Sequence, residues 1–176
     1  MSKNFKFLLF SFLVISIFQV SLTASAQQRS DKDVRRMFIY HFINYIEWPD
    51  EAENNNFKIA VLNDDKMYEV LDKQLNGAKR RGKKIVIEKI DENAALDEYQ
   101  LVYISRNSSK LLKDIKEKTS KYNLLLVTDR NGLASKGSGI NFREVGDKLK
   151  FEINMDEIEK RGLKVANQLK KVAIVI

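Results

Sequence analysis

The chain has 176 residues, of which 44% are hydrophobic, and 31 Lys and Arg against 24 Asp and Glu give it a formal net charge of +7. This length is that of one domain, large enough to bury a core without cross-links. The complete absence of cysteine excludes disulfides and thiolate chemistry. Because the basic residues are scattered among acids and no basic face carries regular aromatics, a nucleic-acid partner is excluded as well.

The first 26 residues have the order of a secretory signal peptide, with two lysines, a mostly apolar run over residues 7–20, and small residues leading up to Ala26. We predict cleavage between Ala26 and Gln27, so that the protein is exported and one mature domain, residues 27–176, remains. The apolar run is short for a membrane span, which takes roughly 20 residues. No cysteine follows it to carry a lipid anchor. Without the two lysines the domain has 29 basic and 24 acidic residues, a net charge of +5.

A helix is predicted soon after the cleavage site. Ser30 can act as the N-cap of this helix, which runs from Asp31 to about Glu47. Pro49 ends it, because the residue before a proline avoids helical geometry. Apolar residues recur along this helix at helical spacing and predict the face that packs on the rest of the domain. That face comprises Val34, Phe38, His41 or Phe42, and Tyr45, with Met37 and Ile46 beside it.

Strands and helices then alternate along the chain. Short and almost continuous apolar runs predict strands at residues 57–62, 85–90, 101–105 and 124–128. Helices are predicted at residues 66–75 and 108–121, with a short helical turn near residues 93–96. Continuous apolar runs are typical of parallel strands that are covered on both faces.

The pattern changes after the last of these strands. Residues 129–139 are rich in glycine and predict a loop, and residues 140–144 and 148–154 predict an antiparallel hairpin. Asn154 can cap a final helix, with Glu157 in the capping-box position. Together the elements predict an α/β fold, a three-layer α/β/α sandwich whose mainly parallel sheet has an antiparallel C-terminal hairpin at one edge.

Polar residues follow three of the predicted strands at their carboxyl ends. The clusters are Asn63-Asp64-Asp65, Ser105-Arg106-Asn107 and Thr128-Asp129-Arg130. In a parallel sheet these ends share one edge, and open α/β folds bind their ligands there. Turns from a strand into a helix need polar caps in any case, so the clusters fit either a ligand crevice or plain capping.

Two further motifs have alternative interpretations. The tripeptide Glu47-Trp48-Pro49 contains the only tryptophan and the only proline, and Trp48 either fills the edge of the core or anchors a partner. The basic run from Lys79 to Lys84 is either a solvated loop or a contact for an anionic surface such as lipid headgroups.

The sequence offers little enzyme machinery. The only histidine, His41, lies inside the first predicted helix, and neither a second histidine nor a cysteine is present to form a usual zinc site. Gly137-Ser138-Gly139 lacks the strand-turn-helix context of a nucleophile elbow and the lysine of a phosphate-binding loop. We therefore expect no catalytic residues, no metal and no cofactor.

The order and spacing of several segments resemble the YfiR family of periplasmic regulatory proteins. The segments are Phe38–Pro49, Ala60–Asp65, Leu101–Ser105, Leu126–Asp129, Gly132–Ala134, Gly139–Asn141, Phe151–Asn154 and Gly162–Lys164. The resemblance covers about residues 33–173, nearly the whole mature chain. It implies a non-catalytic regulator that binds the periplasmic sensor region of an inner-membrane signalling protein, either a diguanylate cyclase or a sensor kinase, and represses it.

The resemblance further implies cyclic-di-GMP signalling in biofilm control, release through an outer-membrane partner, and a tendency to form homodimers. The cysteine pairs that support redox-dependent activity in relatives are absent. We predict a working surface at a corner formed by the Glu47-Trp48 pair and the 129–141 loop, with support from the hairpin. The predicted partner- or ligand-binding residues are Glu47, Trp48, Asn63, Asp129, Asn141, Glu152 and Asn154. The alternative function is a periplasmic small-ligand-binding protein that uses the crevice at the strand carboxyl ends.

Overall fold

The computed structural model describes residues 31–49 and 55–176. The chain divides into two compact units, residues 1–34 and residues 35–176, and the second unit carries the fold. The described residues of the first unit, 31–34, are helical, and the predicted signal peptide lies outside the described residues. Among the described helices, none has both the length and the apolar character that a membrane crossing requires.

The second unit is built around an eight-stranded sheet with the order β10-β8-β7-β6-β5-β2-β4-β3. Its strands are β2 (Asn56–Leu62), β3 (Lys79–Arg80), β4 (Lys83–Ile90), β5 (Leu101–Ile104), β6 (Leu125–Thr128), β7 (Ile140–Val145), β8 (Lys148–Ile153) and β10 (Ile174–Val175). Only the β7–β8 and β3–β4 neighbours are antiparallel within the described sheet. The prediction of a mainly parallel sheet with a C-terminal antiparallel hairpin is therefore confirmed. The predicted place of the hairpin at one edge is wrong, because β10 pairs in parallel with β8 and forms that edge instead.

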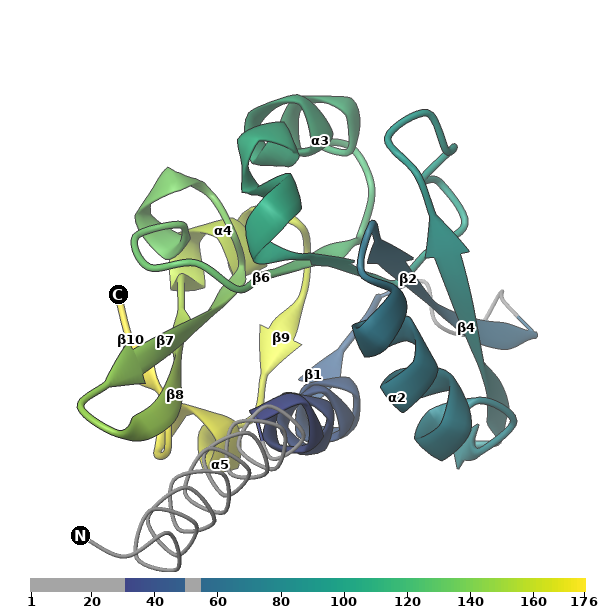
Figure 1. Ribbon diagram of the computed structural model, residues 1–176, viewed down its shortest axis with the longest axis horizontal. Coiled ribbons are helices and arrows are strands. Elements are labelled where there is room, and N and C mark those ends of the chain that lie inside the picture. The colour runs from purple at the N-terminus through teal and green to yellow at the C-terminus, as the bar shows by residue number, and fades with distance from the viewer. Residues whose placement is uncertain (1–30, 50–54) are drawn as a thin grey trace, which may run out of the picture. The chain divides into compact units, whose positions relative to one another are not determined.

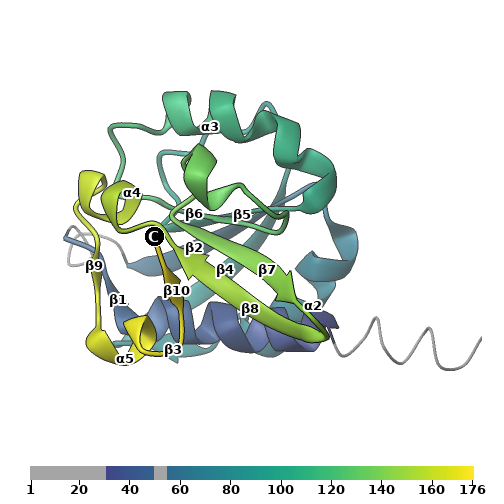
Figure 2. The same cartoon turned by 90° about the vertical axis from the view of Figure 1, so that its left-hand side faces the viewer.

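Helices cover both faces of this sheet, as Figures 1 and 2 show. They are α2 (Asp65–Leu75), η1 (Arg106–Leu111), α3 (Leu112–Lys118), η2 (Ala134–Lys136), α4 (Met155–Lys160) and α5 (Asn167–Lys170). Residues 31–45 form a helix, which we call the first helix. Its 35–45 part packs with α2 on one face of the sheet and joins the larger apolar core. The other face carries α3 and a second core. This is the predicted three-layer α/β/α arrangement.

The first helix ends earlier than predicted, because residues 46–47 leave it to form a strand. Strand β1 (Ile46–Glu47) pairs antiparallel with β9 (Lys164–Val165) in a separate two-stranded sheet. Strands of two residues carry no periodicity, so the sequence pattern does not reveal them. This small sheet ties the end of the first helix to the C-terminal part of the chain.

The buried face of the first helix also differs from the prediction. Ile39, Phe42, Ile43 and Ile46 are fully buried, whereas Tyr45 is 39% exposed. Of the other predicted members, Phe38 is partly buried against the core, Val34 and His41 are intermediate and Met37 is exposed. The helix has apolar residues on two faces, so helical spacing alone could not tell the inner face from the outer one.

Smaller differences concern the loops and caps. The helical turn predicted near residues 93–96 is an irregular turn, and the predicted 129–139 loop contains the short helix η2. Asn154 caps α4 as predicted, since its side chain accepts a hydrogen bond from the Glu157 amide at 3.1 Å. The reciprocal half of the capping box is missing, because the Asn154 amide binds the Gly139 carbonyl instead.

Candidate functional site

The predicted site residues lie at two opposite ends of the parallel strands. Trp48 lies at the amino end, where its indole Nε1 donates to the carbonyl of Gln100, just before β5, at 3.0 Å. Asp129 lies at the carboxyl end, directly after β6. The structure therefore does not bring Glu47 and Trp48 together with the 129–141 loop in one corner, and each end has to be considered separately.

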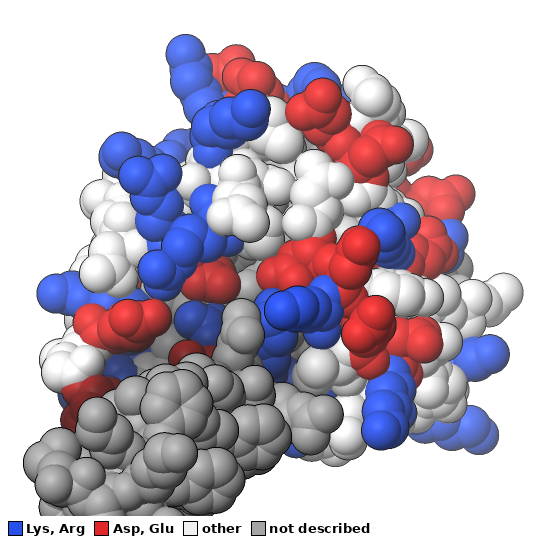
Figure 3. All heavy atoms as spheres, in the orientation of Figure 1, with Lys and Arg blue, Asp and Glu red and all other residues white. Residues whose placement is uncertain are grey.

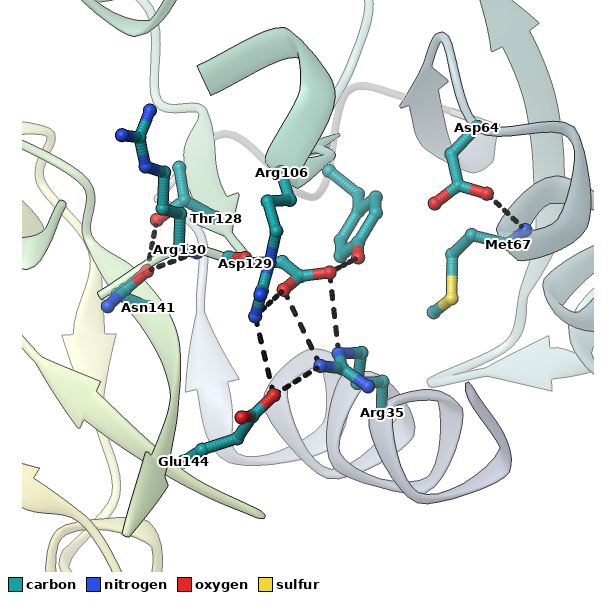
Figure 4. Close-up of polar contacts among 10 residues, drawn as sticks. Arg35, Asp64, Met67, Arg106, Thr128, Asp129, Arg130, Asn141 and Glu144 are labelled. Carbon is teal, nitrogen blue, oxygen red and sulfur yellow. Dashed lines mark hydrogen bonds and ion pairs between the residues drawn. The ribbon is translucent and has the colours of Figure 1, made fainter. Parts of the chain in front are cut away.

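At the carboxyl end, the Asp129 side chain is the centre of an ion network (Figure 4). The Tyr103 hydroxyl donates to Asp129 Oδ2 at 2.7 Å, and Arg35 Nη2 donates to Oδ1 at 3.5 Å. Arg106 Nε donates to the Asp129 backbone carbonyl at 3.3 Å, and Arg106 Nη2 binds Glu144 Oε1 at 3.3 Å. We call these five residues the Asp129 cluster. Because Arg35 belongs to the first helix, the cluster joins the start of its 35–45 part to the sheet.

The residues of the Asp129 cluster differ in burial, and burial determines the protonation of Tyr103. The side chains of Arg35 and Asp129 are 9% and 14% exposed, whereas those of Arg106 and Glu144 are 57% and 56% exposed. Burial raises the pKa of Tyr103 well above its usual range, and the adjacent Asp129 carboxylate raises it further, while Arg35 lowers it in part. Tyr103 therefore keeps its proton and acts as a fixed hydrogen-bond donor to Asp129.

Three of the other predicted residues form a second polar group beside β6. Thr128 Oγ1 is 2.8 Å from Asn141 Oδ1, and Asn141 Nδ2 donates to Glu152 Oε2 at 2.9 Å. Arg143 pairs with the other Glu152 oxygen at 2.9 Å. Asn154 Nδ2 donates to the Ala134 carbonyl at 2.8 Å. Because Asn141 and Glu152 are buried and bonded to one another, these contacts cross-link β6, β7 and β8.

Asn63 follows β2 and is exposed, with φ of 50°, in the left-handed region that asparagine tolerates better than most residues. The next residue, Asp64, caps α2 by accepting a hydrogen bond from the Met67 amide at 2.9 Å (Figure 4). Of the three predicted strand-end clusters, this one therefore serves as a helix cap.

At the amino end, Trp48 is a core residue with 5% exposure. Its ring meets Phe57 edge to face, with centroids 4.9 Å apart, and the Arg80 guanidinium lies 5.1 Å from the Trp48 centroid. Arg80 is 2% exposed and donates from Nε to the Ile43 carbonyl and from Nη2 to the Ile46 carbonyl, the latter at 3.0 Å. A cation thus binds the free carbonyls at the end of the first helix, where the helix dipole is negative.

The outer face of the first helix carries an exposed aromatic stripe. Met37, Tyr40 and Tyr45 are 43%, 44% and 39% exposed. The His41 ring stacks on Tyr45 at a centroid distance of 5.9 Å and meets Tyr40 edge-on at 6.2 Å. These four residues, which we call the outer stripe, recur three to four positions apart and therefore lie along one side of the helix.

The arrangement offers little reactive chemistry. No group of three or more His, Asp or Glu side chains in the described residues is placed to hold a metal ion. One buried hydroxyl, Ser105 Oγ at the carboxyl end of β5, finds no hydrogen-bond partner there. On the face shown in Figure 3, basic and acidic side chains are interspersed.

Sequence reasoning missed the side chains that bind Asp129 and the burial of Arg80 at the end of the first helix. Arg35 lies four residues before Ile39, so a charged residue begins the buried stripe of the first helix. A buried arginine requires a carboxylate or carbonyl partner, but that signal in the sequence does not indicate which residue provides it. Arg80 gave no such signal, because its neighbours in sequence are also basic.

The fold and site define a doubly wound α/β protein. Numbered by their order in the chain, the parallel strands β4-β2-β5-β6-β7 lie in the order 2-1-3-4-5. Successive strands are added on one side of β2 and then on the other, so the strand order reverses between β2 and β5. The chain belongs to the YfiR/HmsC-like family, which matches it over residues 32–174. This is a family of periplasmic regulators.

A solved structure with a similar fold is that of a conserved domain protein from Vibrio cholerae O1 biovar El Tor strain N16961. The two are 10% identical with a TM-score of 0.52, and the match covers 80% of this chain and 59% of the other. At this identity the likeness concerns the fold alone, and this chain spans less than two thirds of that protein's length. No curated protein matches the sequence.

Proposed function

We propose that this protein is a non-catalytic regulator that is exported to the periplasm, where its signal peptide is removed after Ala26. It binds the periplasmic region of an inner-membrane signalling protein, a diguanylate cyclase or a sensor kinase, and represses it. Membership of a family of periplasmic regulators supports this proposal. An outer-membrane protein that relieves the repression is part of the same proposal.

The observation that carries the proposal is the outer stripe. Tyrosine and methionine are enriched in protein interfaces, and exposed aromatic anchors supply most of the binding energy there. Tyr40 and Tyr45 are held by their contacts with His41, and the Asn44 side chain donates to the Tyr40 carbonyl at 2.7 Å. A surface that is ordered before binding loses less conformational entropy when a partner arrives.

The predicted site residues enter this proposal mainly as supports of the first helix. Asp129 binds Arg35 near the start of the 35–45 part of the helix, and Trp48 packs with Arg80 at its end. Both ends of the helical segment are thus fixed on the sheet, which holds the outer stripe in place. Glu47 is exposed beside the end of the helix, where its carboxylate lies 3.9 Å from Arg81, and it belongs to the proposed binding surface.

The test is capture of the membrane partner from detergent-solubilised membranes by the mature protein. We expect the Tyr40→Ala, Tyr45→Ala double variant to bind at least 30-fold more weakly, as the loss of one hot spot of about 2 kcal/mol requires. The matched control is Val145→Ala, because Val145 at the hairpin tip is as exposed as Tyr45, at 39%. If the double variant has an unchanged melting temperature and still captures the partner like the control, the outer stripe is not the binding surface.

Ser105 favours a second candidate, a small-ligand-binding protein. Its buried hydroxyl lacks a partner within the described chain and lies at the carboxyl end of β5, next to the point where the strand order reverses. Ligands of open α/β sheets bind at this point. A panel of periplasmic metabolites should then raise the melting temperature of the wild-type protein and not that of Ser105→Ala. The absence of any shift would remove this candidate.

A further inference from the structure

The basic run of the sequence forms a tight hairpin turn between β3 and β4, which we call the basic turn (residues 79–84). Arg80 pairs with Lys83 and Lys79 pairs with Lys84 across the two strands. At the tip Arg81 and Gly82 have φ of 46° and 86°. Positive φ at both central residues is typical of a type I′ turn, for which Asn-Gly is preferred. Arginine at the first position costs conformational energy that asparagine would save.

One side chain of the basic turn, that of Arg80, is buried in the fold. Arg80 points inward and binds the carbonyls that end the first helix. Lys79, Arg81 and Lys84 are exposed. Lys79 and Lys84 are directly opposite one another, and like charges in that position destabilise a strand pair. No ion pair of either lysine is found among the described residues, so their charge does not stabilise the fold.

A further basic residue, Lys164, lies near the turn, with the carboxylate of Glu47 between them. Glu47 lies 3.9 Å from Arg81, and its partner in the register of β1 and β9 is Lys164, which is exposed. Lys164 therefore adjoins the turn through Glu47. Figure 3 shows basic side chains at the lower right, where Figure 1 places the start of β4. Arg80 fixes the turn on the core, so these charges are presented by a rigid support.

We propose that the basic turn docks the protein on a membrane surface by binding anionic phospholipid headgroups. Several cations on a narrow tip complement a dense array of phosphates. Lysine is depleted in protein–protein interfaces, and no aromatic side chain lies among residues 79–84 to stack on a base. The turn adjoins the end of the first helix, so docking brings the outer stripe close to the membrane in which the proposed partner resides.

The test is flotation of the mature protein with vesicles of neutral phosphatidylcholine, with and without phosphatidylglycerol. We expect binding only to the anionic vesicles, and its loss at high salt, because surface charge interactions are screened. Each basic residue near such a surface contributes a factor of about five, so the Lys79→Gln, Arg81→Gln, Lys84→Gln variant should bind about 100-fold more weakly. Its melting temperature should change little, because it removes a like-charge pair together with the exposed Arg81–Glu47 ion pair, which contributes little.

The matched control removes the same charge from η1 and α3, away from the edge of the sheet that carries the basic turn, through Lys110→Gln, Lys113→Gln and Lys118→Gln. These lysines are exposed on η1 and α3, and their variant should bind anionic vesicles like the wild type. Equal binding to neutral vesicles, or equal loss in both triple variants, would overturn the proposal. So would a basic-turn variant that keeps vesicle binding but no longer captures the membrane protein in detergent, since the turn would then be a protein interface.

Discussion

Replacing Arg80 with alanine removes the cation on which the end of the first helix depends. Two hydrogen bonds from the guanidinium to the Ile43 and Ile46 carbonyls are lost, and a bond to a charged group contributes about 1.5–3 kcal/mol. The cation–π contacts with Trp48 and Phe57, at 5.1 and 4.5 Å, are lost as well. The burial of the charged guanidinium has an energetic cost that partly offsets these favourable contacts. The same burial lowers the pKa of Arg80 to about 10, with a smaller contribution from Arg81.

The net expectation is a loss of about 3 kcal/mol in the free energy of unfolding, or about 6–12 °C in melting temperature for a domain of this size. Urea denaturation followed by circular dichroism measures it. Arg80→Lys keeps the charge without the planar fork and should fall between wild type and Arg80→Ala. Arg81→Ala, at the exposed neighbour, should stay within about 0.5 kcal/mol of wild type. An Arg80→Ala protein as stable as Arg81→Ala would refute the reasoning.

Three further outcomes are expected. Phe42→Ala, at a fully buried ring in contact with Phe38 and Phe151, should cost about 3–5 kcal/mol of unfolding free energy in urea denaturation, and a loss below about 1 would contradict the packing. Burial opposes the ionisation of Glu157, but Lys116 and Lys160 outweigh it and lower the pKa of this carboxyl below 4.5. The free energy of unfolding should therefore fall as the pH drops below 4.5, and it should fall less steeply in Glu157→Gln. Mass spectrometry of the periplasmic fraction should find the mature N-terminus at Gln27 rather than Met1.

The parts of the fold that followed from the sequence are those that rest on long apolar runs or on standard capping chemistry. Strands β2, β5 and β6 are almost continuous in buried residues, and such runs allow few other interpretations. The hairpin followed from two alternating segments around a short turn, and Asn154 followed from its N-cap position. Local sequence and tertiary structure agree at these positions.

The parts that the sequence did not reveal depend on contacts between distant segments. Arg35 meets Asp129 across 94 positions of the chain, and Arg80 meets Ile43 across 37. Neither contact leaves a local pattern. The outer stripe was missed for a different reason: Tyr45 is as apolar as a core residue, and only its position relative to the sheet makes it exposed. Trp48 was predicted either to fill the edge of the core or to anchor a partner, and the sequence could not show that its ring is buried beside Arg80.

The central claim, that the outer stripe binds a membrane signalling protein, is tested most directly by photo-crosslinking in living cells. A photoreactive phenylalanine analogue is placed at Tyr40, and in a parallel strain at Val145, which is also exposed but lies on the hairpin tip. The account predicts an adduct between position 40 and an inner-membrane protein with a cyclase or kinase domain, and none from position 145. An adduct from position 145 alone, or none from position 40 in cells in which the protein still represses its target, would contradict it.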